Sequence, residues 1–195
     1  MRRTALTLLA SLTLVTAPAS NAAPIFFDVN LIGANEVPSN ASPGTGTGNI
    51  AFDDALKTLS LHVTFAGLLG PTTAMHIHCC TPPTGNAGVA TQVPSFMGFP
   101  LGVTSGTYSQ MFDMTLASFY NPAFITMSGG TVESAFDILA AGMLGGMSYL
   151  NIHSTTFPGG EIRGTLNTVP EPGVLSLLGL ALVGLAYIRR RKRLS

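Results

Sequence analysis

Three histidines are the residues of this chain best suited to binding chemistry. His76 and His78 flank a single residue in Met75-His76-Ile77-His78-Cys79-Cys80, and His153 ends Leu150-Asn151-Ile152-His153. On an extended strand, side chains two residues apart point to the same face, with their α-carbons about 6.5 Å apart. Two imidazoles placed in this way can share a zinc or copper ion, which takes nitrogen ligands at about 2 Å. The pattern makes His76, His78 and His153 a candidate copper or zinc site, on the condition that their strands are neighbours.

The same histidines have a plainer interpretation. Leu150 and Ile152 occupy the apolar face of their segment, so His153 is expected to face outward together with Asn151. Histidines on a polar face that are hydrogen-bonded to backbone or water produce this pattern without a metal. The fourth histidine, His62, lies on the polar face of its own alternating segment and is interpreted as a surface residue.

Cys79 and Cys80 are the two cysteines of the chain, and they are adjacent. Free thiols rarely persist in the oxidising compartments that exported proteins reach. Adjacent α-carbons lie about 3.8 Å apart across a trans peptide bond, below the usual disulfide range of about 4.4–6.8 Å. Three states therefore stay open: a strained disulfide between the two neighbours, thiolate ligation beside His78, or a bond to another chain. A rigid loop without a redox role is the favoured interpretation.

Arg163 is a candidate for a structural ion pair. It lies in Pro158-Gly159-Gly160-Glu161-Ile162-Arg163-Gly164, and Glu36 in Asn35-Glu36-Val37-Pro38 is its first candidate partner. A bidentate pair between these two residues would join an early segment to the last strand. Anion or sugar binding by Arg163 is the weaker alternative, because a single guanidinium in an acidic domain makes a poor anion site.

Short alternating segments must position these side chains. Apolar and polar residues alternate in several runs separated by glycine- and proline-rich breaks, which is typical of half-buried strands. The runs are 25–31, 50–52, 59–65, 108–116, 150–152 and 161–166. The stretch 39–48 is of low complexity and is predicted to be a loop.

Two short helices are expected among the strands. Asn121-Pro122 suits the N-cap and first turn of a helix that continues through Ile125. A second helix is predicted by apolar residues that recur at helical spacing from Val132 to Met143, with Thr131 as its cap. The fold class is therefore mainly β: an antiparallel β-sandwich or barrel-like domain with one or two short helices.

The charge distribution excludes one class of partner. The chain of 195 residues carries no net charge, but most of its basic residues lie at the two ends. Between residues 24 and 168 only Lys57 and Arg163 are basic, against eight acidic residues, which gives a net charge of −6. A nucleic-acid-binding domain requires a basic face, so no nucleic-acid partner is expected.

Both ends of the chain have sequence patterns typical of targeting segments. Residues 1–22 have the basic start, short apolar run and small residues before the cleavage site of a secretory signal peptide. Residues 169–195 contain Pro170-Glu171-Pro172, then an uncharged stretch from Val174 to Ile188 and five basic residues. Fifteen helical residues span about 22 Å, which is short for a hydrocarbon core of about 30 Å. The basic cluster would stay in the cytoplasm, with the domain at 23–168 outside.

This order of a Pro-Glu-Pro site, a short apolar helix and a basic tail resembles the PEP-CTERM sorting signal. The resemblance implies a Gram-negative bacterium that makes exopolysaccharide. It also implies transient anchoring in the inner membrane and removal of the tail near Pro170, Glu171 and Pro172 by an exosortase-type enzyme. The plainer alternative is a permanent single-span anchor. The final location implied is the outer surface or the extracellular matrix.

The domain itself resembles the CHRD family, which is named for chordin and is also found in secreted microbial proteins. The resemblance covers residues 31–166 and implies a β-rich extracellular module without a settled activity. Cys79-Cys80 depart from the small residues usual after the His-x-His pair, so loop function does not transfer simply. The matching motifs are Leu31-Ile32-Gly33-Ala34-Asn35-Glu36-Val37-Pro38, Ala74-Met75-His76-Ile77-His78, Tyr149-Leu150-Asn151-Ile152-His153 and Gly159-Gly160-Glu161-Ile162-Arg163-Gly164.

Three functions follow from these patterns, in order of preference. The first is a non-catalytic surface or matrix protein associated with exopolysaccharide, because no nucleophile–base set and no phosphate loop are visible. The second is a module that binds copper or zinc through His76, His78 and His153. The third is a metal-dependent oxidoreductase. A His-x-His pair on a β-sandwich is similar to copper–zinc superoxide dismutase, but four histidines cannot supply that family's two-metal ligand set.

Overall fold

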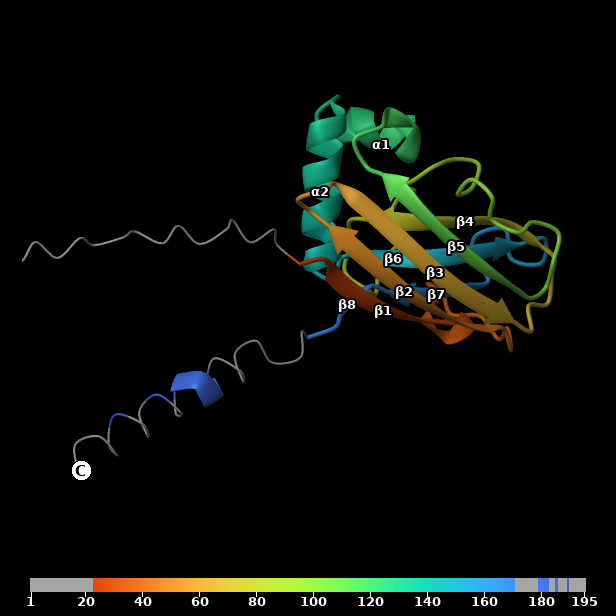
Figure 1. The fold of residues 1–195 in the computed structure, drawn as a ribbon. Coiled ribbons are helices and arrows are strands. Elements are labelled where there is room, and N and C mark those ends of the chain that lie inside the picture. The colour runs from red at the N-terminus through yellow and green to blue at the C-terminus, as the bar shows by residue number, and fades with distance from the viewer. Residues whose placement is uncertain (1–22, 171–178, 183–184, 186–188, 190–195) are drawn as a thin grey trace, which may run out of the picture.

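A single antiparallel sheet forms the domain. The computed structural model describes residues 23–170, 179–182, 185 and 189. Within these residues the strands follow the order β4-β6-β7-β1-β2-β3-β5, and β8 pairs with β1. The strands are β1 (Ile25–Ile32), β2 (Thr45–Asp53), β3 (Thr58–Ala66), β4 (Thr72–Cys79), β5 (Gly106–Asp113), β6 (Ser148–Ser154), β7 (Ile162–Thr165) and β8 (Asn167–Thr168). The predicted mainly β class is confirmed, as an open, half-barrel sheet (Figure 1).

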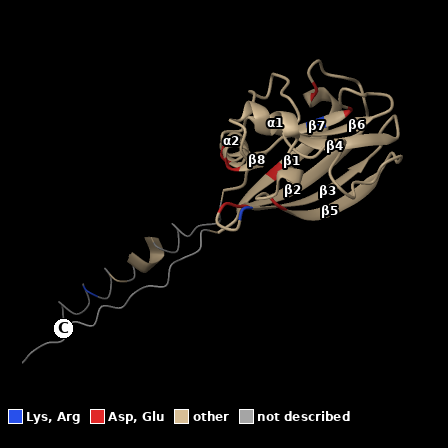
Figure 2. Cartoon of the chain, turned by 90° about the horizontal axis from the view of Figure 1, so that it is seen from above, with Lys and Arg blue, Asp and Glu red and all other residues tan. Residues whose placement is uncertain are grey.

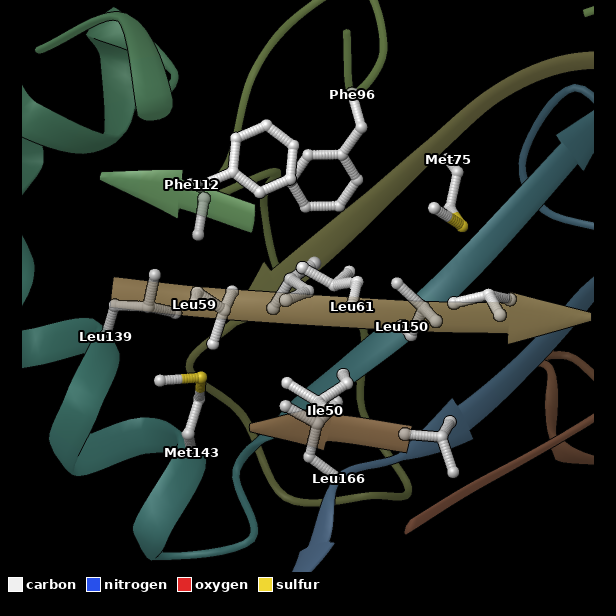
Figure 3. Packing of buried hydrophobic residues seen from close by; sticks show 14 of the residues in the cluster. Ile50, Leu59, Leu61, Met75, Phe96, Phe112, Leu139, Met143, Leu150 and Leu166 are labelled. Carbon is white, nitrogen blue, oxygen red and sulfur yellow. The ribbon is translucent and has the colours of Figure 1, made fainter. Parts of the chain in front are cut away.

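The core lies inside the curl of this sheet. Figure 3 shows side chains of β2 and β3 packed with Leu150 of β6 and Met75 of β4, all of them buried. The alternation predicted for residues 25–31 and 59–65 places their apolar residues on this inner face, with the exception of the exposed Phe26. Burial of apolar surface is the main source of stability for such a domain.

Both expected helices are present, and α2 helps to close the core. The helices are α1 (Pro122–Met127) and α2 (Val132–Leu144), and short 3₁₀ turns cover Gly33–Asn35 and Ala117–Phe119. Thr131 caps α2 in a capping box with Ser134. The helix stands beside one end of the strands (Figure 1), where Phe136 packs on Phe52 of β2 with 5.8 Å between ring centroids.

The predicted loop at 39–48 is wrong in its second half, because β2 begins at Thr45. Gly46 pairs with Leu31 on one side and with Phe65 on the other. A Cβ atom added at Gly46 would lie only 2.7 Å from the Thr64 carbonyl oxygen. Glycine is therefore required here by close backbone approach within a sheet, a role that composition alone does not distinguish from a turn.

The run 108–116 is also shorter than predicted. β5 ends at Asp113. Gln110 lies on the same face as the buried Tyr108 and Phe112 but is exposed, and Leu116, which follows the strand, is exposed as well. A 3₁₀ turn begins directly after Leu116, so the chain leaves the sheet before the alternating pattern ends.

Candidate metal centre

Neighbouring strands β4 and β6 bring the three histidines together. Register pairs His76 with Asn151 and Ala74 with His153, so all three imidazoles lie on the outer face of the sheet, opposite the core. Ring centroids are 5.2 Å apart for His76 and His153, 5.7 Å for His78 and His153, and 5.9 Å for His76 and His78. One ring nitrogen from each residue lies within 4.8 Å of the other two.

The orientation of each ring is fixed by a backbone carbonyl oxygen. A carbonyl only accepts hydrogen bonds, so the nitrogen facing it carries the proton of a neutral ring. The second nitrogen of each ring then presents a lone pair, as metal ligation requires. The carbonyl contacts are His76 Nε2 to Pro94 (2.8 Å), His78 Nδ1 to Ala87 (2.9 Å) and His153 Nδ1 to Pro158 (2.9 Å).

The three remaining nitrogens are buried and unpartnered. They are His76 Nδ1, His78 Nε2 and His153 Nε2, and none has a hydrogen-bond partner among the described residues. A buried polar atom without a partner costs stability, so a cluster of three calls for a ligand that satisfies all of them. The contacting atoms are three neutral nitrogens with lone pairs, and no carboxylate among the described residues joins the group.

Burial keeps these rings neutral. Desolvation lowers the pKa of both His76 and His78 to about 4, from an ordinary value of 6.5, despite the hydrogen bonds to backbone carbonyls that favour protonation. Repulsion between neighbouring imidazoliums lowers the pKa of these two groups further. Burial also lowers the pKa of His153. At neutral pH no proton has to leave before a metal binds.

The donor set fits zinc or copper. Three imidazoles without a carboxylate suit these ions and are poor ligands for calcium or magnesium. A tetrahedral ion with bonds of about 2.0 Å holds its nitrogens about 3.3 Å apart, which is compatible with nitrogens that lie within 4.8 Å of one another once the rings approach on binding.

His153 and Asn151 face away from the core as expected, but they are buried rather than exposed to solvent. Both lie on the face opposite Leu150 and Ile152, but His153 is only 9% exposed and Asn151 only 2%. Every residue of β6 is buried. The chain segments that supply the Ala87, Pro94 and Pro158 carbonyls cover this face, and periodicity within a strand does not reveal such a covering. His62, by contrast, is exposed on β3 as expected.

Tyr149 supports the centre and was not singled out from the sequence. Its ring stacks on His78 with centroids 4.8 Å apart and planes 7° apart. The Arg163 guanidinium lies over the same ring, 4.4 Å from its centroid. The signal available in the sequence was its place two residues before Asn151 and four before His153, on the same strand face.

Arg163 is a buried hub rather than half of a bidentate pair. Its Nε lies 3.9 Å from Glu36 Oε2, and both side chains are buried. The stronger contacts go elsewhere: Arg163 donates to the Asn35 carbonyl (2.6 Å), the Gly85 carbonyl (3.2 Å), Asn86 Oδ1 (2.9 Å) and the Pro83 carbonyl (3.1 Å). Figure 2 shows that charged residues are sparse in the domain. Few other charged groups are therefore available to bind these carbonyl oxygens, and the buried Arg163 side chain holds three segments together.

Glu36 lies in the same network with an altered acidity. Burial raises the pKa of its carboxyl to about 7, although the Arg163 charge and the nearby Asn151 side chain favour the ionised form. Glu36 Oε1 is buried and has no hydrogen-bond partner among the described residues.

Cys79 and Cys80 are joined by a disulfide. Of the three states left open by the sequence, the structure has the bond between neighbours, so neither sulfur is a free thiolate beside His78. Cys79 is buried on the core side at the end of β4, and Cys80 is exposed. Both sulfurs pack closely against Gly142 of α2, where a Cβ atom would collide with them.

The sorting motif falls at the edge of the described chain. Pro170 is exposed, whereas Glu171 and Pro172 lie outside the described residues, as does the proposed signal peptide at 1–22. In the part of the chain that the structure describes, no helix has the length and apolar character needed to cross a membrane.

Comparison with known families identifies both parts of the chain. The model of the CHRD domain matches residues 27–166. The chain belongs to the CHRD family. The model of the PEP-CTERM protein-sorting motif matches residues 168–192. No curated protein and no solved structure matches this CHRD protein.

The two matches establish its cellular route in outline. The PEP-CTERM motif marks an exported protein that is recognised by the exosortase system of Gram-negative bacteria. Neither the CHRD domain nor the sorting motif is an enzymatic family.

Proposed function

We propose that this CHRD protein is a non-catalytic surface or matrix protein whose domain binds one copper or zinc ion through His76, His78 and His153. The observation that carries the metal part is the convergence of three unpartnered nitrogens within 4.8 Å of one another. Backbone carbonyls orient all three rings as neutral donors, which is the outer-shell arrangement expected around metal-ligating histidines. A metal-dependent oxidoreductase is the less favoured alternative.

A metal titration tests this site, with a matched control in the chain. The titration uses chelator-stripped protein. Each of the single variants that lack one ligand is expected to bind copper or zinc about 100-fold or more weakly than wild type; these variants are His76→Ala, His78→Ala and His153→Ala. His62→Ala removes the fourth histidine, which is exposed on another strand, and is expected to leave the affinity unchanged. Equal affinities in all four variants would assign the uptake to some other site.

The second part of the proposal is association with exopolysaccharide. It rests on what the resemblance of the tail to the PEP-CTERM signal implies, namely a bacterium that makes exopolysaccharide, and the family match establishes only the sorting motif itself. Before processing, the apolar stretch at 174–188 would hold the protein in the inner membrane with its basic tail in the cytoplasm.

Deletion of residues 171–195 tests this route. The truncated protein keeps every described strand and is expected to appear in the culture medium or periplasm instead of the surface fraction. Fractionation of a strain that makes no exopolysaccharide separates the two claims: the full chain is expected to be processed there but to be lost from the cell surface. An unchanged distribution of the truncated protein contradicts sorting by the tail.

A further inference from the structure

The outer face of the sheet is open to solvent over strands β1, β2, β3 and β5. Connecting segments cover the outer face over β4 and β6, where every residue of β6 is buried. On the other strands the outward-pointing side chains are accessible, and Asn49, His62 and Ser109 are exposed. The helix α2 stands beside one end of the strands (Figure 1). This part of the outer face is therefore free to contact a ligand.

Cross-strand pairing arranges this face in rows of polar side chains, most of them uncharged. Two neighbouring rows are Asn30, Thr47, Thr64 and Thr107, and Asp28, Asn49, His62 and Ser109. Hydroxyl and amide groups can both donate and accept hydrogen bonds. Asp28 is the one acid of these two rows, and its Oδ1 accepts a hydrogen bond from Asn49 Nδ2 at 2.6 Å.

A groove with apolar walls crosses the same face in the next row. Register aligns Phe26, Ala51, Ser60 and Met111 in that order across the four strands. Phe26 is 49% exposed and Met111 is 66% exposed, and the small side chains of Ala51 and Ser60 lie between them. The hollow has a volume of about 440 Å³ and is also lined by Asn49. Apolar walls beside hydroxyl and amide groups match a sugar ring, which has apolar C–H faces and a rim of hydroxyl groups.

Two further hollows extend this groove along the face. One, of about 260 Å³, is lined by Asn30, Thr47 and Thr64. The other, of about 630 Å³, is lined by Asn30, Thr165 and Asn167 among others, so the two hollows share a wall. Asn30 lies four residues from Phe26 on β1, which is about 13 Å along a strand. The hollows therefore form an elongated series, which suits a chain of linked units better than a compact small molecule.

The charges of this region favour an uncharged ligand. Among the described residues that line the three hollows, Arg163 is the one lysine or arginine, and its side chain is buried and donates to protein acceptors. The domain at 24–168 has a net charge of −6, so it repels a polymer rich in uronic acids or sulfate. A protein partner is disfavoured too, because Phe26 and Met111 are separated and do not form the clustered anchor of a protein interface.

We propose that the outer face of β1, β2, β3 and β5 binds an uncharged polysaccharide chain, with one sugar ring held between Phe26 and Met111. This inference rests on the exopolysaccharide part of the proposed function and is independent of the metal centre. The rows of hydroxyl and amide side chains bind the neighbouring units of the polymer, and Asn30 leads the chain toward the hollow beside Asn167.

Binding of the full chain to polysaccharide from its host tests this face. The matrix polysaccharide is freed of protein and separated by anion exchange into an uncharged and an acidic fraction, and each fraction is immobilised on beads. Phe26→Ala and Met111→Ala are each expected to weaken binding to the uncharged fraction by about tenfold or more. Ala51→Leu fills the groove without removing a side-chain contact and is expected to cause a similar loss. The control is Met127→Ala, which changes a side chain 76% exposed on α1 and is expected to leave binding unchanged.

Thermal unfolding of the same variants separates loss of binding from loss of fold. Binding to the uncharged fraction that is unchanged in all three groove variants overturns the proposal but leaves the association with exopolysaccharide standing. The same holds for a wild-type chain that binds only the acidic fraction. A wild-type chain that binds untreated matrix but neither protein-free fraction has a protein partner, which overturns the proposal. A wild-type chain that binds neither the fractions nor the untreated matrix contradicts the exopolysaccharide association itself.

Discussion

His76 and His78 are together expected to remove about 4–6 kcal/mol from the free energy of unfolding of chelator-stripped protein as the pH falls from 6.5 to 4. Burial lowers the pKa of His76 and His78 to about 4 in the folded domain, against 6.5 for an unshielded histidine. Between these values the unfolded chain binds protons that the folded domain refuses, so stability decreases with falling pH. Each histidine contributes about 2–3 kcal/mol through this linkage. The contribution is complete above pH 6.5.

Glu36 acts in the opposite direction over part of the same range. Its pKa is raised from 4.5 to about 7, so its contribution is complete below pH 4.5 and is lost as the pH rises through 7. Two histidines outweigh one carboxyl, and the lowered pKa of His153 adds to their side. The net effect between pH 6.5 and 4.5 is therefore a loss of stability as the solution becomes more acidic.

Urea unfolding of the metal-free protein at several pH values measures this dependence. The double variant His76→Asn/His78→Asn is expected to flatten the profile, whereas His62→Asn, which changes an exposed histidine, is expected to keep the wild-type slope. A wild-type profile that is flat from pH 6.5 to 4.5 contradicts the buried, neutral state of the histidine cluster.

Arg163→Ala is expected to destabilise the domain by about 3–5 kcal/mol, because it removes a buried cation and leaves its partners unpaired. The side chain donates to carbonyls of residues 35, 83 and 85, and it also packs on Tyr149. Arg163→Lys keeps the charge but loses the planar fork, so it is expected to recover less than half of this loss.

The other basic residue of the domain serves as the control. Lys57 lies half-buried with its Nζ 3.7 Å from the centre of the Phe136 ring, and Lys57→Ala is expected to cost about 1 kcal/mol or less. Thermal unfolding of the three variants at pH 7 compares them directly. A melting temperature of Arg163→Ala equal to that of wild type contradicts the role of Arg163 as a hub.

Local patterns in the sequence were sufficient to predict the framework of the fold. Strict alternation in Leu59-Ser60-Leu61-His62-Val63-Thr64-Phe65 gave β3 its inner and outer faces, and helical spacing with the Thr131 cap gave α2. Both signals depend on neighbours within one segment. Gly46 and Gly48 were misread for the same reason, because close packing against β1 and β3 is a property of the sheet and not of the segment.

The residues of the site could be predicted from the sequence, but their burial and their hydrogen-bond partners could not. His76 and His78 share a face by spacing alone, whereas the approach of His153 depends on the pairing of β6 with β4. The carbonyls of Pro94 and Pro158 come from connecting segments. The path of these segments cannot be predicted from a periodic pattern of apolar residues, as that of a strand or helix can. Burial of the imidazoles, and with it their lowered pKa, follows from that path.

Elemental analysis of the exported protein tests the proposed metal centre most directly. The full chain, purified from its host without chelator, is expected to carry about one equivalent of copper or zinc, which satisfies three nitrogen donors with one ion. The double variant His76→Ala/His78→Ala is expected to carry none and to remain folded. A wild-type protein that is folded, free of metal and unable to take up copper or zinc on titration contradicts the proposed function and leaves the three histidines as structural residues.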